Sequence, residues 1–337
     1  MRIVRTDREL ECPIVDAHFR AMGAELVLLP DGVPRGELIE AAREAALLLM
    51  CYTSIDRAVI EAAGRLKGIV KYGVGIDAID VDAAIDGGVP VVNIPEYAEQ
   101  TVAEAAFAMM IALSRRLLPM DRAMRREGWL WPVSRWLGND IAGKTVGLIG
   151  VGRIGRAMAR MAGAGFGARV IGYDPHLPGE TMRRHGIEPC TDLRALMATS
   201  DFVSLHCVLN EETRGIVGAA EIAAMRPDAC LINVSRGALV DEMALLAALR
   251  EGRIRGAALD VFAKEPLALQ GHPLSALFGM ENVILMPHLA FYTEEAMERL
   301  ERETLERCRE LLSGGPVLVK SHDPRLRRQR KGVRFAD

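Results

Sequence analysis

Short β-branched and apolar runs alternate along the chain with longer Ala- and Leu-rich stretches, whose apolar positions recur at helical spacing. This alternation is typical of an α/β fold, in which helices cover a parallel sheet. A first series predicts strands at residues 24–29, 46–50, 68–72 and 90–93, with helices at 54–63, 81–86 and 101–116. A second series begins near Lys144 and predicts strands at residues 145–149, 169–173, 202–205, 230–233, 256–259 and 283–286. A final helix at 293–313 follows the last strand, and we expect it to return to the first series.

Composition narrows the class of protein without identifying it. The 337 residues are enough for two domains, and 50% hydrophobic and 26% charged residues are ordinary for a globular protein. The formal net charge of −3 gives no overall attraction to nucleic acid or to an anionic membrane, so neither is predicted as a partner. The six cysteines show no C-x-x-C pair and no zinc-ligand spacing, which predicts reduced thiols and no metal site. The N-terminus is charged, unlike a signal peptide, and a cytoplasmic location is expected.

A glycine-rich segment separates the first strand of the second series from the helix after it. It reads Gly150-x-Gly152-x-x-Gly155, and the next strand ends at Asp174, 19 residues after Gly155. In a dinucleotide-binding βαβ unit, such glycines permit the tight turn, the close approach of the pyrophosphate and the packing of helix on strand. Asp174 can bind the ribose hydroxyls and repel a 2′-phosphate, and no arginine follows it. The sequence therefore predicts NAD rather than NADP.

Three later segments each place a reactive side chain just after a predicted strand, where ligands bind in open α/β sheets. They carry Arg236 before a glycine, Glu265 before a proline, and His288 after a proline. In order and spacing they resemble the N-x-x-R-G, D-V-F-x-x-E-P and P-H-x-A motifs of the D-isomer-specific 2-hydroxyacid dehydrogenase family. The segment Tyr72-Gly-Val-Gly-Ile-Asp77 agrees as well, and the resemblance covers about residues 45–315.

The resemblance implies a catalytic role for each of these three side chains. His288 would be the acid/base that exchanges a proton with the substrate carbonyl, since imidazole titrates near neutral pH. Glu265 would orient the ring and stabilise its charged form. Arg236 would fork onto the substrate carboxylate, which lysine cannot do with the same geometry.

The resemblance also implies two sets of binding residues. The cofactor would be bound by Thr101, Gly150, Gly152, Arg153, Ile154, Gly155, Asp174, His206, Cys207, Thr213, Val234, Ser235, Arg236, Asp260 and His288. The substrate would be bound by Tyr52, Val74, Gly75, Tyr97, Arg236 and Tyr292, with the N–H groups of Val74 and Gly75 on its carboxylate.

The substrate itself stays open among small 2-keto and 2-hydroxy acids. Tyr97 and Tyr292 resemble the D-lactate dehydrogenase branch and suggest an uncharged or aromatic substrate, although tyrosine can equally be core. Lys71 stands where the phosphoglycerate dehydrogenase branch tends to carry an arginine for phosphate. Other segments resemble the C-terminal-binding-protein branch, so the alternatives are a phosphoglycerate-type dehydrogenase and an NAD(H)-sensing regulatory protein. The basic tail from Lys320 could be an interaction arm, but we expect it to be disordered and solvated.

The expected architecture is two Rossmann-like domains. A flavodoxin-like substrate domain would comprise residues 1–98 and 292–337, and an NAD-binding Rossmann domain would comprise residues 99–291, with the active site in the cleft and two chain crossings as the hinge. The family resemblance implies a homodimer. The helix at 101–116 and the Trp-rich segment 129–136 are candidate interface elements, and each could equally be core.

Overall fold

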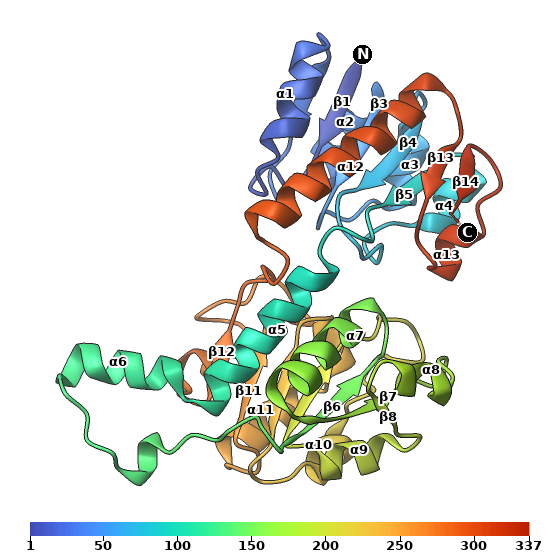
Figure 1. The fold of residues 1–337 in the computed structure, drawn as a ribbon. Helices are drawn as coiled ribbons and strands as arrows, with labels where there is room; N and C mark the ends of the chain where they lie inside the picture. The colour runs from blue at the N-terminus through green and yellow to red at the C-terminus, as the bar shows by residue number, and fades with distance from the viewer. Residues whose placement is uncertain (337) are drawn as a thin grey trace. The chain divides into compact units, whose positions relative to one another are not determined.

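The computed structural model describes residues 1–336, and contacts between residues divide the chain into two units (Figure 1). Unit 1 consists of Met1–Ala98 together with the C-terminal segment from Thr293, and unit 2 consists of Glu99–Tyr292. Each is an α/β unit on a parallel sheet, so the predicted fold class is confirmed. No helix in the described part of the chain is both long and apolar enough to cross a membrane.

Unit 1 is built on a five-stranded parallel sheet in the order β2-β1-β3-β4-β5. Its strands are β1 (Arg2–Arg5), β2 (Glu25–Leu28), β3 (Ala45–Met50), β4 (Gly68–Lys71) and β5 (Val91–Asn93). Its helices are α1 (Pro13–Ala21), α2 (Arg35–Ala42), α3 (Arg57–Ala62), α4 (Val81–Asp86), α12 (Glu294–Ser313) and α13 (Pro324–Arg327). The order 2-1-3-4-5 is that of flavodoxin-like sheets. Helix α12 packs on α1 and against β4, as expected for a helix that returns to the first series.

Strand β1 was not predicted, because its two apolar residues stand between Arg2 and Arg5. Arg5 is nevertheless buried. Its Nε and Nη2 each donate to a carboxylate oxygen of Asp16 at 2.8 Å, and its Nη1 donates to the carbonyl of Leu10 at 2.9 Å. A buried charge is tolerated when it is paired and hydrogen-bonded in this way. The local pattern of polarity could not reveal a partner eleven residues away.

The C-terminal tail is folded, so the expectation that it is disordered was wrong. Strand β13 (Val317–Val319) pairs in parallel with β14 (Val333–Phe335). Between them the buried Gln329 side chain bonds both backbone groups of Val91, on the edge strand β5, at 2.7 and 2.9 Å. Three tail arginines pair with carboxylates elsewhere in unit 1, in the pairs Arg325–Asp77, Arg328–Asp82 and Arg334–Glu310. The basic tail was expected to be solvated because the carboxylates that pair with its arginines are distant in the sequence.

Unit 2 contains a seven-stranded parallel sheet in the order β12-β11-β10-β9-β6-β7-β8. Its strands are β6 (Thr145–Ile149), β7 (Arg169–Tyr173), β8 (Glu188–Pro189), β9 (Phe202–Leu205), β10 (Cys230–Asn233), β11 (Gly256–Leu259) and β12 (Val283–Leu285). Its α-helices are α5 (Glu99–Ser114), α6 (Leu117–Glu127), α7 (Arg153–Ala159), α8 (Gly179–Arg184), α9 (Leu193–Thr199), α10 (Ala219–Ala224) and α11 (Glu242–Arg250). Short 3-10 and π segments are η1 (Ser134–Trp136), η2 (Arg160–Gly165), η3 (Gly237–Leu239) and η4 (Ser275–Gly279). The order β8-β7-β6-β9-β10-β11 is that of a Rossmann sheet, with β12 added at its edge.

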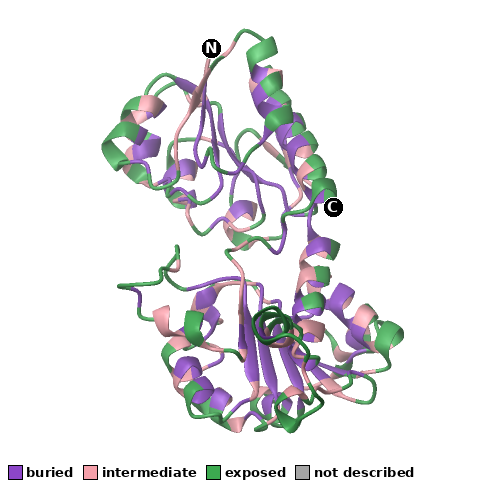
Figure 2. Ribbon diagram, turned by 90° about the vertical axis from the view of Figure 1, so that its left-hand side faces the viewer, coloured by how far each residue is buried: buried purple, intermediate pink, exposed green. Residues whose placement is uncertain are grey.

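The sheet of unit 2 is buried between two apolar layers (Figure 2). One layer includes Leu205, Leu231 and Leu246, and the other includes Met110 and Val146. Helix α5 belongs to the second layer and contacts β10 and β11. The long apolar helix predicted at 101–116 is therefore largely core.

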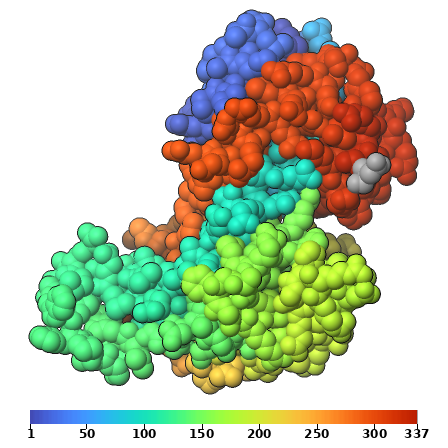
Figure 3. Space-filling model, viewed as in Figure 1, coloured from blue at the N-terminus to red at the C-terminus, as the bar shows by residue number. Residues whose placement is uncertain are grey.

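The segment after α5 projects from unit 2 as an arm made of α6 and η1 (Figures 1 and 3). Trp129, Trp131 and Leu137 are each 74% exposed on it. Ion pairing of Arg135 with Glu281, at 2.9 Å, ties the far end of the arm back to the body of the unit. The Trp-rich segment is therefore exposed, whereas α5 buries one side in the core.

Candidate active site

Two glycines of the loop between β6 and α7 are required by close packing. Gly150 has φ +91°, and a Cβ there would lie 2.6 Å from the backbone nitrogen of Cys207. A Cβ at Gly155 would lie 2.4 Å from the carbonyl oxygen of Gly150. At Gly152, by contrast, no atom of residues 1–336 outside the glycine's own chain neighbourhood lies within 4 Å of the Cβ position. Packing does not explain that glycine, and the open space fits the close approach of a pyrophosphate to the backbone.

Asp174 follows β7 beside this loop. One of its carboxylate oxygens accepts a hydrogen bond from the Val151 N–H at 2.9 Å, and the other accepts from the His176 N–H at 3.0 Å. Each carboxylate oxygen has a further lone pair for a ribose hydroxyl. The predicted acid is thus held next to the glycine loop by the loop itself.

The residues after β9 supply neutral groups beneath the glycine loop. The His206 Nε2 lies 2.9 Å from the Ser204 hydroxyl, and burial lowers the pKa of His206 to about 4. Burial raises the pKa of the Cys207 thiol to about 11. Both side chains are therefore uncharged at neutral pH, so the phosphates would meet no added negative charge here.

The other predicted cofactor residues also lie in unit 2. Thr101 is buried in α5, which contacts α7, and Ile154 packs into the core from the start of α7. Arg153 pairs with Glu99 of α5 at 2.6 Å, a contact that the sequence analysis did not foresee. Thr213 closes a turn with Asn210, its N–H donating to the amide oxygen at 2.9 Å.

A hydrogen-bonded turn after β10 carries Arg236. The Asn233 side chain accepts from the Ser235 N–H at 3.0 Å and donates to the Arg236 carbonyl at 2.9 Å. The Ser235 hydroxyl donates to the carbonyl of Leu205 at 2.9 Å, which ties the turn to β9, and Val234 is buried beside it. The N-x-x-R-G motif named Asn233 without giving it a role, and the structure shows that it shapes the turn.

His288 and Glu265 form a direct pair. The His288 Nδ1 lies 2.8 Å from the Glu265 Oε2, and the other carboxylate oxygen accepts from the Phe262 N–H at 2.9 Å. His288 has φ +59°, an unusual conformation for a residue that is not glycine. Burial favours protonated Glu265, but the bond to His288, that residue's charge, the Phe262 N–H and the charge of Arg236 outweigh it and hold the pKa of Glu265 below its usual value. The glutamate is therefore an anion at neutral pH.

Asp260 fixes the backbone around this pair. Its two carboxylate oxygens accept from the N–H groups of Leu289 and Ala290 at 2.8 and 3.0 Å, and its carbonyl accepts from the His288 N–H at 2.7 Å. Burial raises the pKa of Asp260 above its usual value in spite of these bonds. Asp260 was predicted to bind the cofactor, and its hydrogen bonds also anchor the histidine segment.

A glycine brings the arginine and glutamate segments together. A Cβ at Gly237 would lie only 2.0 Å from the carbonyl carbon of Phe262, so no other residue fits there without displacing backbone. Arg236 is consequently close enough for its charge to act on Glu265. The three predicted catalytic side chains thus gather at the carboxyl ends of β10, β11 and β12, the same edge of the sheet as the glycine loop.

In unit 1, Asp7 organises the carboxyl edge of the sheet. Its carboxylate accepts from the N–H groups of Cys51, Tyr52 and Thr53 at 2.7, 3.0 and 3.0 Å, and so shapes the turn that carries Tyr52. Asp7 was not predicted as a site residue, because it follows β1, a strand that was itself missed. On the same edge, the Asn93 amide donates to the Val74 carbonyl at 2.6 Å and holds the segment of Val74 and Gly75.

The predicted substrate residues are divided between the units. Tyr52, Val74, Gly75 and Tyr97 lie in unit 1, whereas Arg236 and Tyr292 lie in unit 2. Tyr292, 45% exposed, packs edge-on against Phe291 with 6.0 Å between ring centroids. Tyr97 is buried.

Comparison with known proteins agrees with this geometry. Residues 107–290 match the NAD-binding domain of D-isomer-specific 2-hydroxyacid dehydrogenases. The chain belongs to the D-isomer-specific 2-hydroxyacid dehydrogenase family, and unit 2 is its NAD-binding Rossmann domain; the predicted family and cofactor are confirmed.

Individual relatives differ in activity. The glyoxylate reductase of Thermococcus litoralis is 40% identical over 275 residues, which cover 80% of this chain and 81% of that protein. The D-3-phosphoglycerate dehydrogenase of Methanocaldococcus jannaschii is 40% identical over 284 residues, 84% of this chain but 53% of that protein. The chain thus spans about half the length of that relative. The solved D-lactate dehydrogenase of Aquifex aeolicus, complexed with NAD and lactic acid, has a TM-score of 0.81, 29% identity, and coverage of 93% of this chain and 96% of that chain.

Proposed function

We propose that this protein is an NAD-dependent D-2-hydroxyacid dehydrogenase, or in the reverse direction a 2-keto acid reductase. The observation that carries the proposal is the His288–Glu265 pair, 2.8 Å apart and within electrostatic reach of Arg236, at the edge of the sheet that holds the glycine loop. Reduction of a 2-keto acid requires an acid/base group and an arginine for the substrate carboxylate, whereas binding of NAD alone requires neither.

The proposed chemistry is hydride transfer between the nicotinamide, which supplies or accepts the hydride when bound, and C2 of the substrate. The Nδ1 of His288 is engaged by Glu265, so the Nε2 carries the proton that goes to the carbonyl oxygen during reduction. The Glu265 carboxylate stabilises the imidazolium before the transfer. Arg236 binds the substrate carboxylate through its fork of N–H groups and polarises the neighbouring carbonyl. In unit 1, the N–H groups of Val74 and Gly75 are proposed to bind a substrate carboxylate.

Asp174 is proposed to select NAD over NADP. Replacing it with alanine removes both the acceptor for the ribose hydroxyls and the charge that repels a 2′-phosphate. We expect the affinity for NADH to fall by roughly 10-fold and the preference for NADH over NADPH to narrow by about the same factor or more. Titration of NADH and NADPH by their fluorescence measures both. An unchanged preference would refute the role of Asp174.

A phosphate-bearing substrate is a second candidate, because Lys71 is buried at the carboxyl end of β4. Its ammonium bonds the Cys51 carbonyl and lies 5.5 Å from the centroid of the Tyr52 ring. Within residues 1–336, no carboxylate lies at ion-pair distance from it. A buried cation without a carboxylate is suited to an anionic group on the substrate.

The Lys71→Ala variant tests this candidate. If Lys71 binds phosphate, kcat/KM for phosphohydroxypyruvate should fall by roughly 100-fold or more, while kcat/KM for pyruvate should stay close to the wild-type value. The matched control is Lys67→Ala, since Lys67 is exposed just before the same strand. Equal losses on both substrates would assign Lys71 a structural role instead.

We further propose that the protein is a homodimer whose interface includes the arm of unit 2. Trp129, Trp131 and Leu137 are large apolar side chains left 74% exposed on one projecting segment, which is typical of an interface. Sedimentation should give the mass of two chains at micromolar concentration. A Trp129→Ser/Trp131→Ser variant should sediment nearer to one chain. A wild-type monomer at that concentration would end the proposal.

A further inference from the structure

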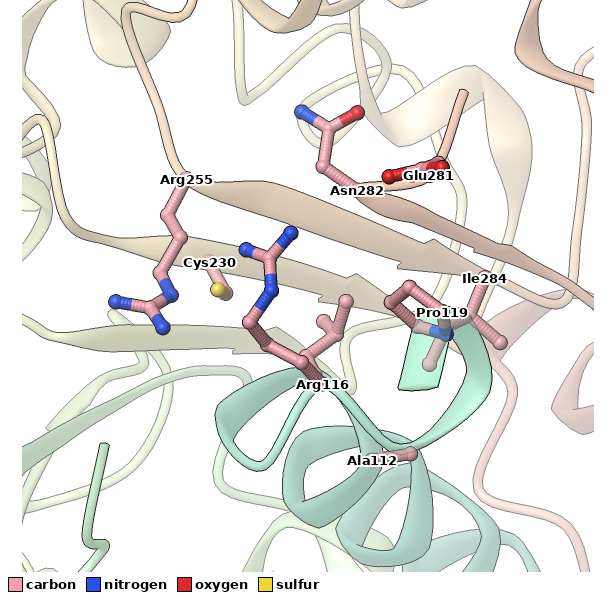
Figure 4. A pocket seen from close by; sticks show the side chains of 9 residues that line it. Ala112, Arg116, Pro119, Cys230, Arg255, Glu281, Asn282 and Ile284 are labelled. Atoms are coloured by element: carbon pink, nitrogen blue, oxygen red, sulfur yellow. The ribbon is translucent and has the colours of Figure 1, made fainter. Parts of the chain in front are cut away.

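A hollow lies in unit 2 at the edge of the sheet opposite to the glycine loop (Figure 4). Its wall is formed by the amino ends of three strands: Cys230 opens β10, Arg255 precedes β11, and Asn282 precedes β12. The corner between α5 and α6, with Arg116, closes the other side. The hollow is therefore separate from the candidate active site, which lies at the carboxyl ends of the same strands.

Two arginines face this hollow from different elements. Arg116 occupies the corner between α5 and α6 with φ +51°, a conformation uncommon for a residue other than glycine. Figure 4 shows the guanidinium groups of Arg116 and Arg255 on either side of the Cys230 thiol. Burial raises the pKa of that thiol to about 12 although both arginines act to lower it, so the thiol is neutral and supplies no counter-charge.

The two arginines are not ion-paired within the described residues. The Arg255 Nη2 donates to the Leu137 carbonyl at 2.9 Å, but neither arginine lies at ion-pair distance from a carboxylate of residues 1–336. The Arg116 Nε is buried without a hydrogen-bond partner there. Glu281, the acid in the lining, is already paired with Arg135 at 2.9 Å.

A buried N–H donor without a partner and two neighbouring like charges are both unfavourable, and an anion in the hollow would relieve both. Guanidinium groups bind carboxylate and phosphate oxygens through paired N–H donors. We propose that this hollow is a binding site for a small oxyanion, a phosphate or a carboxylate, held by Arg116 and Arg255.

Thermal unfolding of the full chain with saturating NAD⁺ tests the proposal, because the bound cofactor keeps phosphate out of the glycine loop. In about 20 mM sodium phosphate, the Tm should exceed that in sodium chloride of equal ionic strength by about 2–4 °C. Sodium citrate in a parallel series distinguishes a carboxylate site from a phosphate site. The Arg116→Gln and Arg255→Gln variants should lose the shift.

The control variant is Arg115→Gln, which removes the neighbouring exposed arginine and should keep the full shift. Equilibrium dialysis with radiolabelled phosphate, and in parallel with radiolabelled citrate, measures binding to the NAD⁺-loaded protein directly. This keeps the proposal testable if a variant has a low Tm. About one phosphate or citrate per chain, lost in both glutamine variants, supports the site. The proposal is overturned if the wild type takes up no anion, as when a second copy of the chain fills the hollow. It is also overturned if all variants take up the same amount.

Discussion

Replacing His288 with alanine should lower the rate of keto-acid reduction by roughly 10²- to 10⁴-fold, the range that a positioned acid/base contributes. The reason is that the His288 ring, held by Glu265 at 2.8 Å, is the proposed proton donor to the substrate oxygen. NADH should still bind, because the glycine loop and Asp174 are held by contacts that do not involve His288. Single-turnover kinetics with NADH measures the chemical step, and NADH fluorescence measures binding. Retained turnover would sink the assignment of His288.

The Glu265→Gln variant tests whether the charge of Glu265 is needed to keep the His288 ring protonated. Because its pKa lies below the usual value, Glu265 is ionised across the neutral range and stabilises the charged form of the ring until the pH falls through that lowered pKa. Glutamine keeps a hydrogen bond but removes the charge, so the imidazolium is less favoured. We expect the alkaline limb of the pH profile for reduction to move to lower pH by about one unit. An unmoved limb with lower activity would mean that Glu265 only positions the ring.

Replacing Arg236 with lysine should lower kcat/KM for keto acids by roughly 30- to 1000-fold, about 2–4 kcal/mol, although the positive charge is kept. Lysine cannot present two N–H donors in one plane to a carboxylate, whereas its charge still acts on Glu265. We therefore expect KM to rise and kcat to fall for the keto acid, whereas the pH profile of the reaction should stay unchanged. Arg250→Lys, at the exposed end of α11, is the control. A fall in kcat/KM of less than about 3-fold would contradict paired hydrogen bonding of Arg236 to the substrate carboxylate.

The sequence predicted those parts of the fold whose signal is local. Six of the seven strands of the Rossmann sheet are apolar runs with recognisable lengths and boundaries, whereas β8 is the short pair Glu188–Pro189 and was not predicted. Strand β1 was missed because Arg5 is buried by pairing with Asp16, and the C-terminal tail was misjudged because its arginines meet carboxylates more than twenty residues away. Local polarity cannot report such long-range pairs.

In the candidate site too, residues with a local sequence signal were predicted and residues that depend on distant partners were missed. Arg236, Glu265 and His288 were found through motifs, since each follows a strand in a spaced pattern. Asp7 and Glu99 were missed because their partners come from other elements and their neighbours carry no motif. The Phe262 backbone leaves no room for a side chain at position 237, and the sequence alone could not show why a glycine stands there. Motifs identified the reacting groups, and the structure was needed to find the residues that hold them.

We propose above all that this chain reduces 2-keto acids with NADH. The most direct test is oxidation of NADH by the purified full chain against pyruvate, phenylpyruvate, hydroxypyruvate, glyoxylate and phosphohydroxypyruvate. We expect strong turnover of at least one of them, and the preferred acid would define the side chain that the substrate pocket accepts. Negligible turnover of all five by a protein that still binds NADH would contradict it and favour an NAD(H)-sensing role.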